Sequence, residues 1–130
     1  MPELKRILTT RIVSTPAALD EQIWPDDQLV LRTAPDEVLI SPPLADASPI
    51  LASDPHAIVV SDGSFAGIWL PTETALEFLE HHCEWELPSN RPAFAQGAVA
   101  GIATKLWFEA DRILFIAPAP MAAEFEERLG

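Results

Sequence analysis

His81, His82 and Cys83 form the one cluster of histidine and cysteine in the sequence. These residue types bind transition metals, and a cysteine beside a histidine can act as a nucleophile. The cluster lies near the end of a segment with helical spacing, where successive side chains project about 100° apart. Three consecutive side chains cannot converge on one ion, so we expect no metal site and no activated thiol. The histidines should instead lie near a helix C-terminus, with Cys83 packed as a small apolar residue.

Two other features suggest chemistry at first sight. Asp62 is followed by Gly63, which would suit a carboxylate in a tight turn, but this dipeptide is more typical of a β-hairpin turn. Gly97 and Gly101 do not form a phosphate-binding loop, because no glycine-rich motif follows a strand and opens a helix. We therefore predict no catalytic residue and no cofactor. The alternative is a small enzyme whose site is not visible in the sequence.

Composition and charge narrow the class of protein. The 130 residues suit one domain, and a hydrophobic fraction of 48% is enough for a core. A formal net charge of −12 would repel nucleic acids and anionic membranes, so we expect neither as a partner. The single cysteine cannot form an internal disulfide, and no apolar run has the length of a signal peptide or a membrane span. These observations predict a cytoplasmic protein.

The first half of the chain predicts short elements separated by prolines. Thr15 as N-cap and Pro16 at the first helical position begin a short helix. Residues 29–40 predict a β-hairpin around a turn at 33–36. Five prolines fall within residues 35–55, which predict a long surface loop.

The second half, residues 57–129, predicts a hairpin, a helix, a second hairpin and a second helix. The expected elements are strands Ile58–Val60 and Phe65–Leu70 around a turn at 61–64, helix Thr72–Cys83, strands Ala98–Glu109 and Arg112–Ala117, and helix Pro120–Leu129. The fold class is therefore α+β, a single compact domain of β-hairpins alternating with helices.

Apolar spacing in these elements predicts the core. Thr72 or Thr74 should cap the first of the two later helices, and Leu76, Leu79 and Cys83 should form its buried stripe. We expect a common core between the sheet and the two later helices, made of Leu76, Leu79, Trp69, Trp107, Ile113, Phe115 and Phe125.

Taken in order, several segments resemble the gamma subunit of heterotetrameric sarcosine oxidase. These segments are residues 31–40 (LRTAPDEVLI), 56–63 (HAIVVSDG), 70–87, 94–100 (FAQGAVA) and 103–117 with the closing helix. The resemblance extends over residues 27–130, and residues 1–26 are an N-terminal segment with a short helix. The whole chain, 1–130, is assigned to one α+β domain.

This resemblance implies a fold similar to half of the folate-binding fold of the aminomethyltransferases. It also implies a non-catalytic accessory subunit of a sarcosine-oxidase-like flavoenzyme complex, active in amine and one-carbon metabolism. The partner would be an alpha-like subunit of that enzyme, with a homo-oligomer as the alternative. No catalytic residue is transferred from the family, and no cofactor-binding residue is assigned.

Three apolar side chains are candidates for contact with the partner. Trp85 stands between two glutamates just after the predicted helix, and Leu87 and Phe94 flank a proline-containing turn. The alternative is that they pack into the core. A second possible function is a stand-alone domain that binds a folate-like small molecule. Its anionic tail would require a cation, and the candidates are Arg32, Arg91, Lys105 and Arg112.

Overall fold

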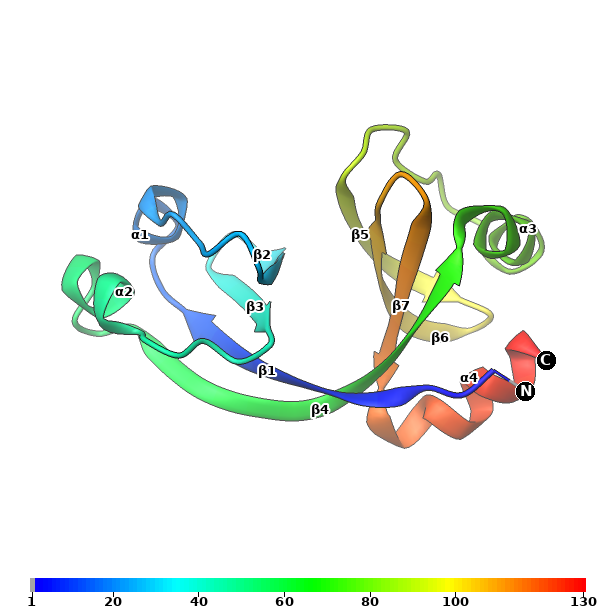
Figure 1. Ribbon diagram of the computed structural model, residues 1–130, viewed down its shortest axis with the longest axis horizontal. Coiled ribbons are helices and arrows are strands. Elements are labelled where there is room, and N and C mark those ends of the chain that lie inside the picture. The colour runs from blue at the N-terminus through cyan, green and yellow to red at the C-terminus, as the bar shows by residue number, and fades with distance from the viewer. Residues whose placement is uncertain (1) are drawn as a thin grey trace. The chain divides into compact units, whose positions relative to one another are not determined.

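A computed structural model describes residues 2–130, which form a mixed α+β structure. Its elements are β1 (Lys5–Val13), α1 (Pro16–Glu21), β2 (Leu29–Ala34), β3 (Glu37–Ser41), α2 (Ser48–Ser53), β4 (Ile58–Pro71), α3 (Thr72–His82), β5 (Ala93–Val99), β6 (Ile102–Phe108), β7 (Arg112–Pro118), a short 3₁₀ helix (Ala119–Met121) and α4 (Ala122–Leu129). The strands are hydrogen-bonded in the order β2-β3-β1-β4-β7-β6-β5 (Figure 1). The predicted α+β class is confirmed.

The chain divides into two compact units. Unit 1 contains the residues up to Arg6 and those from Ser64 to Gly130, and unit 2 contains Ile7–Gly63. Strands β1 and β4 each contribute residues to both units. Unit 2 is therefore a continuous stretch of sequence that interrupts unit 1.

Helix α1, which follows β1 in unit 2, is closely specified by its sequence. The Thr15 hydroxyl oxygen accepts a hydrogen bond from the Ala18 amide at 3.1 Å, and Pro16 opens α1. Strands β2 and β3 then form the predicted antiparallel hairpin, in which Leu31 lies opposite Leu39. One face of this sheet packs against the helices in a core of Ile12, Ala18, Leu19, Val38, Ile40 and Ile50.

The predicted loop over residues 35–55 is wrong in part, because it contains helix α2 after the predicted strand β3. Pro49 is tolerated in α2 because it lies in the first turn, where an amide donor has no partner within the helix. Ile50 then reaches the core of unit 2 with only 1% of its surface exposed. Burial of one apolar residue therefore outweighs the low helix propensity of the surrounding prolines and serines.

The predicted hairpin around Asp62-Gly63 is also wrong, because β4 runs without a turn for 14 residues from Ile58 to Pro71. A two-residue hairpin of the Asp-Gly type needs left-handed backbone angles. Among the described residues, positive φ angles occur at Ala100 and Gly101 and not at Gly63. The polar residues of this segment therefore lie within an extended strand that leaves unit 2 and enters unit 1.

Unit 1 contains a four-stranded antiparallel sheet with helices on one face. The strand order is β4-β7-β6-β5, and Ile68 lies opposite Phe115, which in turn lies opposite Leu106. Figure 1 shows α3 and α4 on the same side of β4 and β7. The fully buried side chains of this core include Leu79, Leu106, Phe108, Ile113, Phe115 and Phe125.

Helix α3 forms where the sequence predicts it, but with a different buried face. Leu79 is 1% exposed, whereas Leu76, which was expected in the same stripe, is 38% exposed. The buried face is instead Ala75 and Leu79, with Phe78 in edge contact with Phe115 and Phe125. The expected threonine cap is also absent: Pro71 precedes the helix and no side chain caps it. The helix therefore turns Ala75, Phe78 and Leu79 toward the core, and Leu76 away from it.

The segment 98–109, expected as one strand, is divided by a tight turn. Ala100 and Gly101 have φ angles of 51° and 78°, the left-handed pair that a two-residue hairpin of the I′ type requires. Strands β5 and β6 are joined there, and β7 follows in the predicted hairpin with β6. The second half of the chain is thus strand, helix, three-stranded meander and helix.

Candidate functional site

The histidines singled out by the sequence lie in the last turn of α3, as expected. Nδ1 of His81 lies 3.0 Å from the Glu77 carbonyl oxygen, and the ring of His82 stacks on Phe78 with centroids 4.4 Å apart. The Cys83 thiol donates to the carbonyl oxygen of Trp85 at 3.5 Å and is half-buried against the core of unit 1. Across residues 2–130, no three His, Cys, Asp or Glu side chains are grouped to hold a metal ion.

Trp85 lies against the edge strand β5. Its indole N–H donates to the Ala98 carbonyl oxygen at 2.8 Å. Gly97 allows this approach, since a Cβ there would lie 2.7 Å from the indole Cε2 and 2.8 Å from Nε1. The indole therefore covers part of an edge that would otherwise expose backbone groups to other chains. An open cavity of about 400 Å³ lies beside it, lined in part by His81, His82 and Glu84.

The three candidate partner residues do not form one patch. Trp85 and Leu87 pack against the core on the helix side of unit 1. Phe94 lies opposite Trp107 in the β5–β6 pair, on the other face of the sheet. All three are half-buried. Because side chains alternate between faces along a strand, a single flat partner surface cannot contact all three through this sheet.

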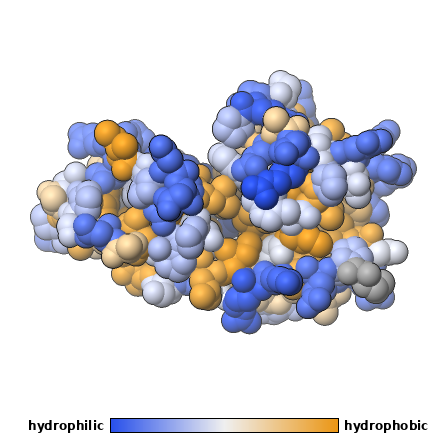
Figure 2. Space-filling model, viewed as in Figure 1, coloured by the Kyte–Doolittle hydropathy of each residue, from blue (hydrophilic) through white to orange (hydrophobic). Residues whose placement is uncertain are grey.

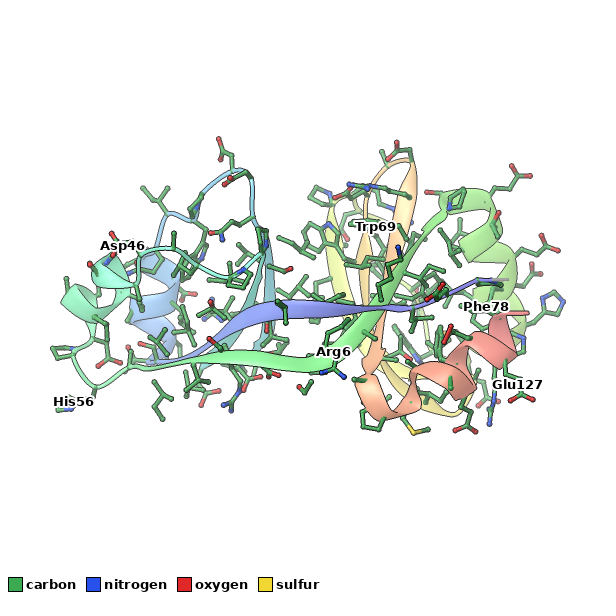
Figure 3. The ribbon with its side chains drawn as sticks, turned by 60° about the horizontal axis from the view of Figure 1, so that its bottom comes forward. Arg6, Asp46, His56, Trp69, Phe78 and Glu127 are labelled. Atoms are coloured by element: carbon green, nitrogen blue, oxygen red, sulfur yellow. The ribbon has the colours of Figure 1, made fainter. Side chains whose placement is uncertain are left out.

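The sheet face turned away from α3 and α4 is rich in aromatic side chains, and we call it the aromatic face. It consists of Phe65, Trp69, Phe94 and Trp107, with Leu114 and Ile116 of β7 between them. Figure 3 shows Trp69 on this side of β4 and Phe78 on the helix side. Trp69 and Trp107 are half-buried rather than mostly buried as the sequence suggested, because they belong to this face and not to the core under the helices.

A polar cluster closes one end of the aromatic face. The Arg112 guanidinium lies 3.7 Å from the centroid of the Trp69 ring, and its Nε donates to Glu109 Oε1 at 2.8 Å. Glu109 Oε2 accepts a second hydrogen bond from the indole N–H of Trp107 at 3.0 Å. One carboxylate therefore connects β6 and β7 and holds an arginine over a tryptophan of β4.

The pKa of Glu109 is lowered from its ordinary value of 4.5, mainly because Arg112 donates a hydrogen bond to the carboxylate. A carboxyl with a lowered folded-state pKa contributes stability above its unfolded pKa and loses it as the pH falls through the folded value. We expect Glu109→Gln to reduce the free energy of unfolding at pH 7 by less than about 1 kcal/mol, because the pair is partly exposed. The deficit should shrink below pH 4.5.

Urea unfolding from pH 7 to pH 3 measures this difference. Glu127→Gln is the control, because Glu127 is exposed on α4 (Figure 3). A deficit of Glu109→Gln that does not change with pH would contradict the role of the charged carboxylate.

Three of the four cations named from the sequence lie over aromatic rings of unit 1. Besides Arg112, the Lys105 ammonium lies 5.1 Å from the Phe65 centroid, and the Arg91 guanidinium lies 4.8 Å from that of Phe108. An open cavity of about 340 Å³ is lined by Arg91, Trp107 and Glu109. Arg32, the fourth cation, lies in unit 2 and is paired with Asp20 at 2.9 Å.

Unit 2 carries an apolar groove that the sequence did not single out. Ile23, just after α1, is 97% exposed and borders a groove of about 210 Å³. The lining includes Trp24, Leu44 and Ile50, with Asp46 as its acidic member. Figure 2 shows hydrophobic atoms at the surface of unit 2 above α1. The signal in the sequence was the Ile-Trp-Pro run that follows a short helix.

No helix among residues 2–130 combines the length and the apolar character needed to cross a bilayer. No family model matches the chain, and no curated protein is significantly similar to it.

Proposed function

We propose that this chain is a cytoplasmic, non-catalytic accessory subunit that binds a larger protein. The resemblance of residues 27–130 to the gamma subunit of sarcosine oxidase suggests the class of partner, an alpha-like subunit of a flavoenzyme. In that assignment the chain has a fold related to half of an aminomethyltransferase domain, and its contribution is to the assembly and not to the reaction.

The observation that carries the proposal is the apolar groove of unit 2. Ile23, with 97% of its surface exposed, continues the apolar lining of this groove, and a contiguous apolar surface of this kind marks interaction sites. The groove beside it, with Trp24 and Leu44 in its wall, offers the concave apolar surface that a protruding side chain of a partner would fill. With a net charge of −12, the chain favours a partner with a basic surface.

Co-purification from the native organism tests the proposal. We expect the tagged chain to retain a protein that carries bound flavin, and Ile23→Asp to lower its recovery by about tenfold or more, as for an interface anchor. Leu76→Asp is the matched control, because Leu76 is also an exposed apolar residue but lies on α3 of unit 1. Recovery should also fall with added salt, since opposite charges are screened.

A lone chain without flavoprotein, or equal recovery with Ile23→Asp, would contradict the proposal.

The second candidate function is binding of a folate-like molecule to unit 1. It is supported by the aromatic face, where Arg112 and Lys105 lie over Trp69 and Phe65, and by the adjoining cavity at Arg91. Planar rings stack on such side chains, and an anionic tail needs a cation. Titration of the isolated chain with folate separates the two candidates, because saturable binding lost in Arg91→Ala would favour the second.

A further inference from the structure

The first residues of β4 form an exposed strand edge in unit 2. Strand β7 pairs with β4 only over Phe65–Pro71, and among the described residues no strand pairs with the outer edge of Ile58–Ser61. The side chains of Ile58 and Val60 are 53% and 41% exposed. An apolar edge strand of this kind is a template for pairing with another chain unless a charge, a proline or a bulge protects it.

Backbone groups alternate in direction along a strand, so successive residues of β4 turn their N–H and C=O groups toward β1 and toward the outer edge. The Thr9 hydroxyl donates to the Asp62 carbonyl oxygen at 3.0 Å, which is a contact on the β1 side. Every second residue of Ile58–Ser61 therefore presents its backbone groups to another chain.

The sequence of this edge is complementary to itself. If two copies pair antiparallel with Val59 opposite Val59, then Ile58 of each copy lies opposite Val60 of the other, on one face of the joined sheet. The same register brings His56 near Asp62 of the second copy, where an imidazole N–H can donate to the carboxylate. Figure 3 shows the His56 side chain pointing out from unit 2, just before β4 begins. The register with Val60 opposite Val60 instead places Ile58 against Asp62, so that Val60 forms the single apolar pair on that face.

We propose that a second copy of this chain adds to the edge of β4 and forms a two-fold symmetric dimer through residues 56–62. The area available to one short strand pair is small, so the dimer is weak. Each chain carries a net charge of −12, so repulsion opposes the dimer and added salt strengthens it. This salt dependence is opposite to that expected for a basic partner at the groove of unit 2. The dimer therefore goes beyond the proposed accessory role. Either proposal can be contradicted by its experiment while the other one holds.

Sedimentation equilibrium of the isolated full chain, from about 10 µM to about 1 mM, tests the dimer. We expect a reversible monomer–dimer equilibrium that shifts toward the dimer at high salt. Val60→Lys should leave the chain monomeric, because a lysine on an edge strand blocks pairing. Ile23→Lys is the matched control, since Ile23 is exposed and apolar but lies outside β4, and it should dimerise like the wild type. Far-UV circular dichroism confirms that both variants are folded.

A monomer at every concentration, or a dimer that survives Val60→Lys in a folded chain, would overturn the proposal. So would a dimer that is lost with Ile23→Lys.

Hydrogen exchange tests the register and the use of the backbone. Alternate amides within Ile58–Ser61 should exchange more slowly as the concentration of the chain rises, while the amide of Glu127, on α4 of unit 1, should not change. His56→Glu should weaken the dimer by about tenfold, because like charges then face each other at two symmetric positions. Unchanged exchange at every amide of Ile58–Ser61 in a dimerising sample would contradict pairing at this edge, and unchanged affinity with His56→Glu would contradict this register.

Discussion

Leu79→Ala is expected to lower the free energy of unfolding by about 2–5 kcal/mol, the usual cost of truncating a fully buried leucine. Leu79 is 1% exposed and packs in the core beneath α3, next to the aromatic cluster of Phe78, Phe115 and Phe125. Removal of its side chain leaves a cavity that these rigid rings cannot fill without losing their edge contacts. Urea unfolding monitored by circular dichroism measures the change.

Leu76 provides a control on the same helix. It carries the same side chain but is 38% exposed, so Leu76→Ala should cost less than about 1 kcal/mol. Equal losses for the two variants would mean that α3 turns the face predicted from its leucine spacing toward the core, and not the face of Ala75 and Leu79.

Gly97→Ala should destabilise the chain by about 1–3 kcal/mol, although alanine is small. The added methyl group would lie 2.7 Å from the Trp85 ring. The indole must move away, which breaks its hydrogen bond to the Ala98 carbonyl oxygen and opens its packing against the core. Tryptophan fluorescence should change together with the midpoint of unfolding.

The effect should depend on the presence of the indole. In a Trp85→Ala background, Gly97→Ala should be neutral or slightly stabilising, because glycine loses more conformational freedom than alanine on entering a strand. An equal loss of stability in both backgrounds would show that the contact with Trp85 is not the reason for a glycine at position 97.

The elements that the sequence predicted correctly have strong local signals. Thr15 and Pro16 define the start of α1 through a side-chain hydrogen bond and a fixed φ angle. The hairpin of β2 and β3 has a proline turn between two apolar runs. The hairpin of β6 and β7 also joins two apolar runs, around Ala110 and Asp111. In each case the residues within one turn decide the structure.

The elements that were missed or misplaced depend on distant residues. Asp62-Gly63 reads as a turn, but pairing with β7 beyond Ser64 keeps β4 extended. Strand β1 was not predicted, because Lys5, Arg6 and Arg11 interrupt the apolar pattern of the strand. Its residue Ile12 is nevertheless buried in the core of unit 2. No local pattern reports which face a distant helix will cover.

The candidate sites likewise divide into those that follow from local sequence and those that depend on distant residues. Helical geometry placed His81 and His82 in the last turn of α3 without any knowledge of the fold. The cluster of Glu109, Arg112 and Trp69 was not foreseen, because it joins three strands whose register the sequence does not state. Ile23 was missed because its exposure depends on how the loop after α1 leaves the helix.

The interruption of unit 1 by unit 2 has a consequence for synthesis on the ribosome. Unit 2 comprises Ile7–Gly63, so all of its residues have been translated before most of unit 1 exists. Leu4, by contrast, belongs to the same core as Phe125 and donates its amide N–H to Glu126 at 3.3 Å. Because domains fold as their residues emerge, Leu4 must wait for α4 before its contacts can form. Unit 1 therefore closes only after α4 has been translated.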